Sequence, residues 1–175
     1  MNTKFPYSIL SWLFGAALMF SCAPTDTFVE GSSETTISAE RGMNVAESET
    51  FMTTLETLDA SDQVTDTFEK EQVKFRIRIM NKTNESQPLR FRTGQKAHMD
   101  IFSGNHLIWS TRSMFSIQMI DEAVVLPQDV LDVTVKWDLL DTQYKSVAPG
   151  IYRLKAEILS EEKVPVPGDV IFEIQ

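Results

Sequence analysis

Short runs in which hydrophobic and polar residues alternate follow one another from about residue 51 to the C-terminus. In residues 73–79, VKFRIRI, every second side chain is apolar, and the ones between are Lys or Arg. A period of two is typical of a β-strand with one buried face. The same alternation recurs at residues 89–92, 99–101, 107–109, 131–138, 152–158 and 170–174.

Turn-forming residues separate these runs, and no helical period is sustained through them. Many short strands with one apolar face predict an all-β fold over residues 51–175, an immunoglobulin-like antiparallel β-sandwich of about seven to nine strands. Trp137 and Tyr152 are expected in or at the edge of its core. The Gly150-x-Tyr152 sequence at the start of a strand is also similar to the tyrosine corner of immunoglobulin-like folds.

A different pattern occupies the N-terminus. Lys4 precedes an apolar run at residues 9–20, ILSWLFGAALMF, which has the length of a signal-peptide core rather than of a transmembrane helix. Ser21 and Cys22 follow, and this order resembles the lipobox of bacterial lipoproteins, where the cysteine is lipidated. We therefore expect a signal peptide over residues 1–21, cleavage between Ser21 and Cys22, and a lipid on Cys22. The alternatives are an uncleaved helical anchor over residues 5–23 and a secretory signal that leaves a free thiol.

Residues 22–50 show no sustained period. They are rich in Ser, Thr and acidic residues, and Arg41 is their only basic residue. Such a composition buries too little apolar surface to offset chain entropy, so the sequence predicts a flexible tether between the lipid and the folded domain. The expected location is the bacterial cell envelope, where the lipid on Cys22 attaches the protein to a membrane.

The charge balance removes one class of partner. The chain has 16 Lys and Arg against 25 Asp and Glu, a formal net charge of -9. Nucleic-acid binding needs a basic surface, so we expect no nucleic-acid partner. Attachment to anionic lipid by charge alone is disfavoured for the same reason, which leaves the lipid on Cys22 as the membrane attachment.

Candidate catalytic and metal-binding groups are few. The sequence lacks the common hydrolase, phosphate-binding and zinc-protease motifs, so we expect no enzymatic activity, no cofactor and no small-molecule substrate. His98 and Asp100 share one face of a predicted strand, and His106 lies across an expected hairpin; solvated outward side chains explain this set better than zinc does. Asp138 and Asp141 are either calcium ligands or turn-forming residues. We expect no bound metal.

Four arginines form a second candidate surface. If the strands on either side of residues 81–88 pair with each other, their arginines project from one solvent face and could receive an acidic partner. The favoured alternative is that neighbouring strands supply acids that pair with them, so that the arginines form no binding surface. The residues are Arg76, Arg78, Arg90 and Arg92.

Several of these segments, taken in order, resemble one known family. They are residues 73–83 (VKFRIRIMNKT), 89–95 (LRFRTGQ), 99–102 (MDIF), 108–118 (IWSTRSMFSIQ), 135–138 (VKWD) and 149–158 (PGIYRLKAEI). Over residues 68–160 they resemble the BsuPI-type intracellular proteinase inhibitor domain. The resemblance implies an immunoglobulin-like β-sandwich that inhibits a proteinase. The founding member of the family is cytoplasmic, whereas an export signal is predicted here, so the identity of the target stays open.

Two functions agree with these predictions. The first is a lipid-anchored proteinase inhibitor that obstructs a serine protease with a loop. The second is a non-inhibitory interaction or structural module of the cell envelope, which binds another envelope protein.

Inhibitors that act by obstruction present an exposed, pre-shaped segment. The candidate segment lies between Trp109 and Phe115, which are both expected to hold its ends in the core. In it, Arg112 would enter an acidic specificity pocket or Met114 an apolar one. The loop of residues 139–146 is a competing candidate. The candidate segment consists of Ser110, Thr111, Arg112, Ser113 and Met114.

Overall fold

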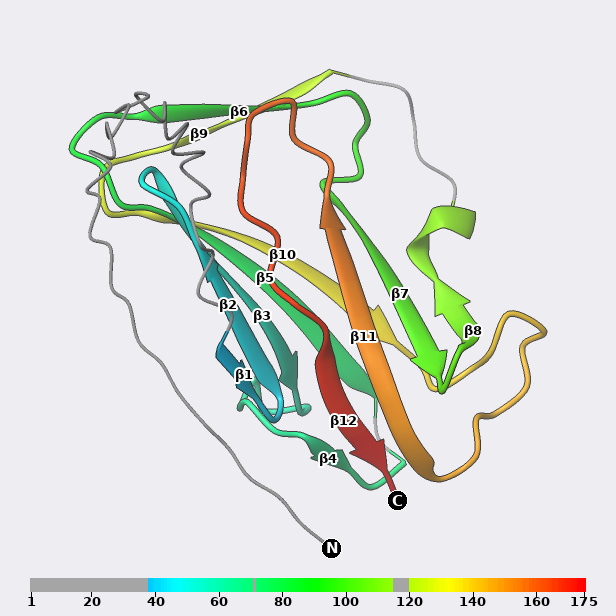
Figure 1. Ribbon diagram of the computed structural model, residues 1–175. Helices are drawn as coiled ribbons and strands as arrows, with labels where there is room; N and C mark the ends of the chain where they lie inside the picture. Colours follow the sequence, from blue (N-terminus) through cyan, green and yellow to red (C-terminus); the bar gives the residue numbers. More distant parts are fainter. Residues whose placement is uncertain (1–37, 71, 115–119) are drawn as a thin grey trace, which may run out of the picture. The chain divides into compact units, whose positions relative to one another are not determined.

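The computed structural model describes residues 38–70, 72–114 and 120–175, which form two facing β-sheets (Figure 1). The first sheet has the strand order β1-β2-β3-β5-β10, and every neighbouring pair in it is antiparallel. Its strands are β1 (Ser38–Glu40), β2 (Met43–Glu47), β3 (Phe51–Leu58), β5 (Val73–Asn81) and β10 (Val130–Trp137).

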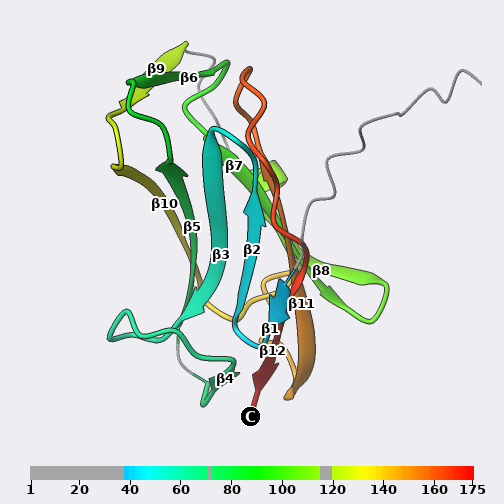
Figure 2. The same ribbon diagram turned by 60° about the vertical axis from the view of Figure 1, so that its left-hand side comes forward.

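The second sheet has the strand order β4-β12-β11-β7-β8. The short strand β4 runs parallel to β12, and the other pairs are antiparallel. Figure 2 shows β3, β5 and β10 in one layer and β11 and β12 in the other. The strands of this sheet are β4 (Thr67–Phe68), β7 (Ala97–Ser103), β8 (His106–Ser110), β11 (Gly150–Ile158) and β12 (Val170–Ile174).

A separate two-stranded ribbon of β6 (Gln87–Phe91) and β9 (Asp121–Val125) lies at one end of the sandwich (Figures 1 and 2). The predicted all-β, immunoglobulin-like sandwich is confirmed, although the described residues hold twelve strands, more than the seven to nine expected. The helical element among them is the single-turn 3₁₀ helix η1 (Thr111–Ser113). The described part of the chain has no helix long and apolar enough to span a membrane.

Alternation along the strands builds the core between the two sheets. Along β5, every second residue is buried and the residues between are half-buried. Trp137 is fully buried, and its ring stacks on Phe75 at 6.2 Å and meets Phe172 of the other sheet edge-on. Tyr152 is 5% exposed, and its hydroxyl donates to the carbonyl oxygen of Ala148 at 2.5 Å. The predicted core positions and the tyrosine-corner contact are therefore confirmed.

The folded domain begins before residue 51, so the predicted tether over residues 22–50 is wrong for its last part. β2 pairs along its whole length with β3, and Ala46 is fully buried. The inward residues of β2 are Asn44 and Ala46, so the strand lacks the apolar alternation that would mark it in the sequence. Pairing with the eight-residue strand β3, which contributes the buried Phe51 and Leu55 to the core, holds β2 in the sheet.

The turn between β1 and β2 also belongs to the fold. Gly42 has a φ of 75°, and a Cβ built there would lie 2.9 Å from the carbonyl oxygen of Thr65. Both the backbone conformation and the close approach require glycine. The predicted signal peptide, Cys22 and the tether as far as residue 37 lie outside the described residues, so they stay predictions.

Candidate functional site

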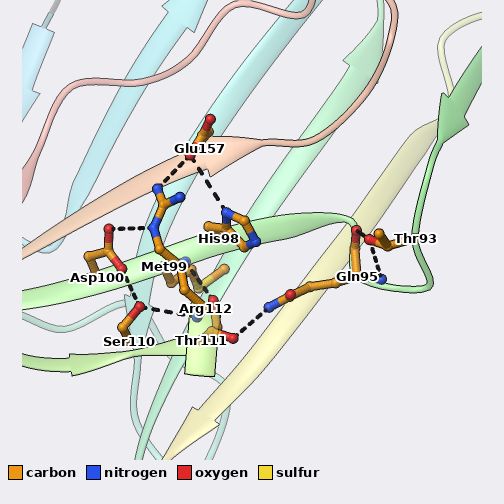
Figure 3. A network of polar contacts seen from close by, with 9 residues as sticks. All are labelled: Thr93, Gln95, His98, Met99, Asp100, Ser110, Thr111, Arg112 and Glu157. Carbon is orange, nitrogen blue, oxygen red and sulfur yellow. Dashed lines mark hydrogen bonds and ion pairs between the residues drawn. The ribbon is translucent and has the colours of Figure 1, made fainter. Parts of the chain in front are cut away.

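Residues 110–114, the candidate inhibitory segment, turn sharply at the end of β8. Ser110 and Thr111 are 7% and 1% exposed. The hydroxyl of Thr111 accepts the backbone N–H of Met99 at 2.9 Å, and its carbonyl oxygen accepts the side-chain amide of Gln95 at 3.0 Å (Figure 3). The first two residues of the predicted segment are therefore held by the sheet and are not available to a partner.

Arg112 is held against the sheet rather than free to enter a pocket. Its Nε donates to Asp100 Oδ2 at 3.2 Å and its Nη2 donates to Glu157 Oε2 at 2.5 Å (Figure 3). Ser110 Oγ donates to the other oxygen of Asp100 at 2.5 Å. The Arg112 side chain is half exposed, but its guanidinium already has two carboxylate partners. An acidic pocket would have to replace both of them, so the geometry does not favour Arg112 as the inserted residue.

These ion pairs shift the protonation of their members. The hydrogen bond from Arg112 lowers the pKa of the Glu157 carboxyl below its ordinary 4.5, and the bonds to Glu157 and Asp100 raise the pKa of Arg112. His98 Nδ1 lies 3.6 Å from the same Glu157 oxygen. A depressed carboxyl pKa stabilises the fold above the unfolded-state pKa, and this contribution is lost as the pH falls through the folded-state pKa. Because the Glu157 side chain is half exposed, solvent screening keeps the contribution small.

The competing loop, residues 139–146, lies beside the same turn. The backbone N–H of Thr142 donates to the carbonyl oxygen of Ile108 on β8 at 2.9 Å. A groove of about 510 Å³ is lined by residues of both segments. The two candidates, treated as rivals in the sequence, therefore form one surface. Its members, termed the two-loop surface below, are Ser113, Met114, Leu140, Thr142 and Tyr144.

Trp109, expected to hold one end of the candidate segment, is partly buried and packs against the core. Its ring lies 6.3 Å from that of Trp137. This half of the expectation is confirmed. Phe115, expected to hold the other end, lies outside the described residues.

The candidate calcium ligands Asp138 and Asp141 lie in the loop that follows Trp137. Asp141 Oδ1 accepts the backbone N–H groups of Gln143 and Lys145, so the turn-forming interpretation is confirmed for it. Asp138 lines the groove. Residues 38–70, 72–114 and 120–175 hold no group of three or more His, Cys, Asp or Glu side chains that could bind a metal ion. His98, Asp100 and His106 therefore do not form such a group.

The four arginines do not form the conditional basic patch. β5 pairs with β3 on one side and β10 on the other, so neither edge is left for β6, which pairs with β9 instead. The four arginines therefore do not share one sheet face. The alternative, that nearby acids pair with them, is confirmed. The pairs are Arg76–Glu56, Arg78–Asp132, Arg90–Glu122 and Arg92–Glu161.

The sequence of the sandwich decides the family. The family model of BsuPI, described as intracellular proteinase inhibitor, matches residues 58–163. The chain belongs to the BsuPI family. The matched range includes both segments that form the two-loop surface, together with Trp137 and Tyr152 of the core. β1, β2, most of β3 and β12 lie outside the BsuPI match.

Comparison with other proteins adds little on the function of this BsuPI member. No curated protein matches the chain. A β-glucosidase from Listeria innocua in complex with glucose is 12% identical with a TM-score of 0.38, and the match covers 74% of this chain but 16% of the enzyme. The CARDB domain of a Pyrococcus furiosus protein in complex with di-metal ions is 12% identical with a TM-score of 0.39, covering 73% and 90% of the two chains. At these values neither likeness carries an argument about activity.

Proposed function

We propose that this chain is a lipid-anchored proteinase inhibitor that obstructs a serine protease with the two-loop surface. The observation that carries the proposal is the BsuPI family match over residues 58–163, which spans the residues of that surface. The family is one of inhibitors, so the protein acts by binding another protein and not by catalysis.

The form of the two-loop surface supports obstruction. Met114 is 46% exposed and Tyr144 is 86% exposed, and a groove lies between the segments that carry them. The backbone bond from Thr142 to Ile108 ties the loop to the edge of the second sheet. A surface that is ordered before binding loses less conformational entropy when it meets an enzyme.

The test of inhibition is a panel of serine proteases titrated with the full chain in detergent. We expect at least one trypsin-, chymotrypsin- or subtilisin-type enzyme to lose activity in proportion to the inhibitor added. Since the inhibitor binds at a protein surface, the effect should saturate at a fixed ratio of inhibitor to enzyme. If no enzyme of the panel is inhibited, the proposal fails and the protein is a non-inhibitory interaction module of the cell envelope.

The lipid anchor is the second part of the proposal and rests on the sequence alone. An apolar segment followed by Ser21 and Cys22 is expected to direct export and lipidation, which would place the inhibitor at a membrane of the bacterial cell envelope. There it would meet a protease of the envelope or the surroundings. We expect Cys22→Ala to abolish labelling by a radioactive fatty acid and to leave the precursor uncleaved. A variant that is processed and partitions into detergent like the wild type would contradict the anchor.

A further inference from the structure

Tyr144 is the most exposed of the described large apolar side chains, at 86%. Its φ of 60° is left-handed, a conformation that favours Gly, Asn or Asp over an aromatic residue. A ring that is almost fully in solvent adds nothing to the core. Neither burial nor backbone conformation therefore accounts for a tyrosine at this position, and an exposed aromatic residue held in an unfavourable conformation points to a function.

The residues around Tyr144 fix the shape of the loop tip. Asp141 Oδ1 accepts the backbone N–H of Gln143 at 2.7 Å and that of Lys145 at 2.9 Å. The N–H of Tyr144 itself donates to the Asp141 carbonyl oxygen at 3.0 Å. Tyr144 is thus bracketed on both sides by hydrogen bonds to one residue, and the backbone that carries it is held in place.

The base of the loop is fixed to the sandwich. The indole Nε1 of Trp137, whose ring is fully buried, donates to the carbonyl oxygen of Leu140 at 2.8 Å. Thr142 is bonded through its N–H to Ile108 on the edge strand β8. The position of the loop on the molecule is therefore as well determined as its shape, and little freedom is lost when a partner binds it.

We propose that Tyr144 is the residue that enters the specificity pocket of the target protease, and that the target is a serine protease with a deep apolar pocket for large aromatic side chains. This inference rests on the proposed inhibitory function and names its target class. Tyr144 is an aromatic residue on a hydrogen-bonded loop beside a groove, and aromatic residues that fill a pocket on the partner supply much of the binding energy at protein interfaces. Such a pocket must also offer a polar group or a water molecule at its base, because the buried phenolic hydroxyl needs a hydrogen-bond partner.

The other candidates of the sequence fit this role less well. Arg112 is bound by Asp100 and Glu157, so it is not free to enter an acidic pocket. Met114 is 46% exposed, half of its surface being covered already, and a flexible unbranched side chain loses more rotamer freedom on binding than a ring does. Met114 lines the groove beside Tyr144 and is assigned to the rim of the contact.

The experiment measures inhibition constants of the full chain in detergent against trypsin-, chymotrypsin- and subtilisin-type proteases. We expect the wild type to inhibit the enzymes with large apolar pockets more strongly than the trypsin type. Tyr144→Asn keeps a residue that tolerates the left-handed φ and is expected to weaken inhibition about 30-fold or more. Tyr144→Phe is expected to lose about fivefold or less, because it gives up one hydroxyl contact.

Two control variants separate the possible explanations. Lys145→Ala changes the neighbouring exposed side chain of the same loop, and Arg112→Gln removes the charge of the rival residue; both are expected to inhibit like the wild type. Equal inhibition by the wild type and Tyr144→Asn, or selective inhibition of the trypsin type, overturns the assignment of Tyr144 and leaves the inhibitory function standing. Absence of inhibition by the wild type overturns the inhibitory function and this inference with it.

Discussion

Replacing Trp137 by alanine is expected to lower the free energy of unfolding by about 3–5 kcal/mol. The side chain is fully buried between the sheets, where its ring contacts Phe75, Tyr152 and Phe172. No neighbouring element can move in to fill so large a space, because both sheets are fixed by their own hydrogen bonds. Urea denaturation followed by far-UV circular dichroism measures the loss.

The matched control for this variant is Thr134→Ala, which changes an exposed residue of the same strand and is expected to cost less than about 1 kcal/mol. Trp137→Phe is the more informative second variant. It keeps most of the apolar volume but removes the bond from Nε1 to Leu140, so it should unfold at an intermediate urea concentration and weaken the loop of residues 139–146. A Trp137→Ala protein within about 1 kcal/mol of the wild type would show that this residue is not a centre of the core.

The central strands could be predicted from the sequence because their burial is periodic. In β5 the apolar residues of VKFRIRI face the core at every second position, and the same holds for β11 around Tyr152 and Leu154. A strand with one buried face can be recognised in the sequence, because its apolar and polar residues alternate. The family resemblance was also recognisable there, since it depends on these same strands and their turns.

The edges of the fold could not be predicted because their stability comes from pairing with other strands and not from an apolar pattern of their own. β2 presents Asn44 and Ala46 to the interior and is held by β3, and β4 is a two-residue strand that pairs in parallel with β12. The pairing of β6 with β9 was missed for a related reason. A strand shows in its own sequence that one face is buried, but not which neighbour lies at its edge.

The candidate site was predicted as two separate loops, and the sequence does not show that they line one groove. Residues 110–114 and 139–146 lie side by side because Trp109 packs on Trp137 of the facing sheet and the N–H of Thr142 bonds to Ile108 of β8. Arg112 meets Asp100 and Glu157 because β7 and β11 are neighbours, a pairing that spacing along the chain does not reveal. One signal was present: Asp141 three residues before Tyr144 is a turn-forming pattern, and it indicates a shaped loop rather than a metal ligand.

Asn81→Asp is expected to cost about 3–5 kcal/mol of unfolding free energy at neutral pH, although the two side chains have the same shape. The Asn81 side chain is fully buried at the end of β5. Its Nδ2 donates to the carbonyl oxygens of Glu85, Val125 and Leu126 at 2.7, 3.0 and 3.2 Å. An aspartate in this place would direct a charged acceptor at three acceptors and would lose every bond that the amide donates.

The other end of the same side chain explains why the amide orientation is determined and supplies the test. Asn81 Oδ1 accepts the N–H and the hydroxyl of Thr83 at 2.9 and 2.8 Å, so a rotated amide would lose these contacts as well. The matched control is Asn84→Asp, the same chemical change on an exposed residue of the adjoining loop, which should leave stability within about 0.5 kcal/mol of the wild type. Urea unfolding of both variants beside the wild type measures the difference. Protonation removes the buried charge, so the loss of unfolding free energy in Asn81→Asp should shrink as the pH is lowered. A small loss at neutral pH would instead mean that water or a rearranged loop satisfies the carboxylate at this position.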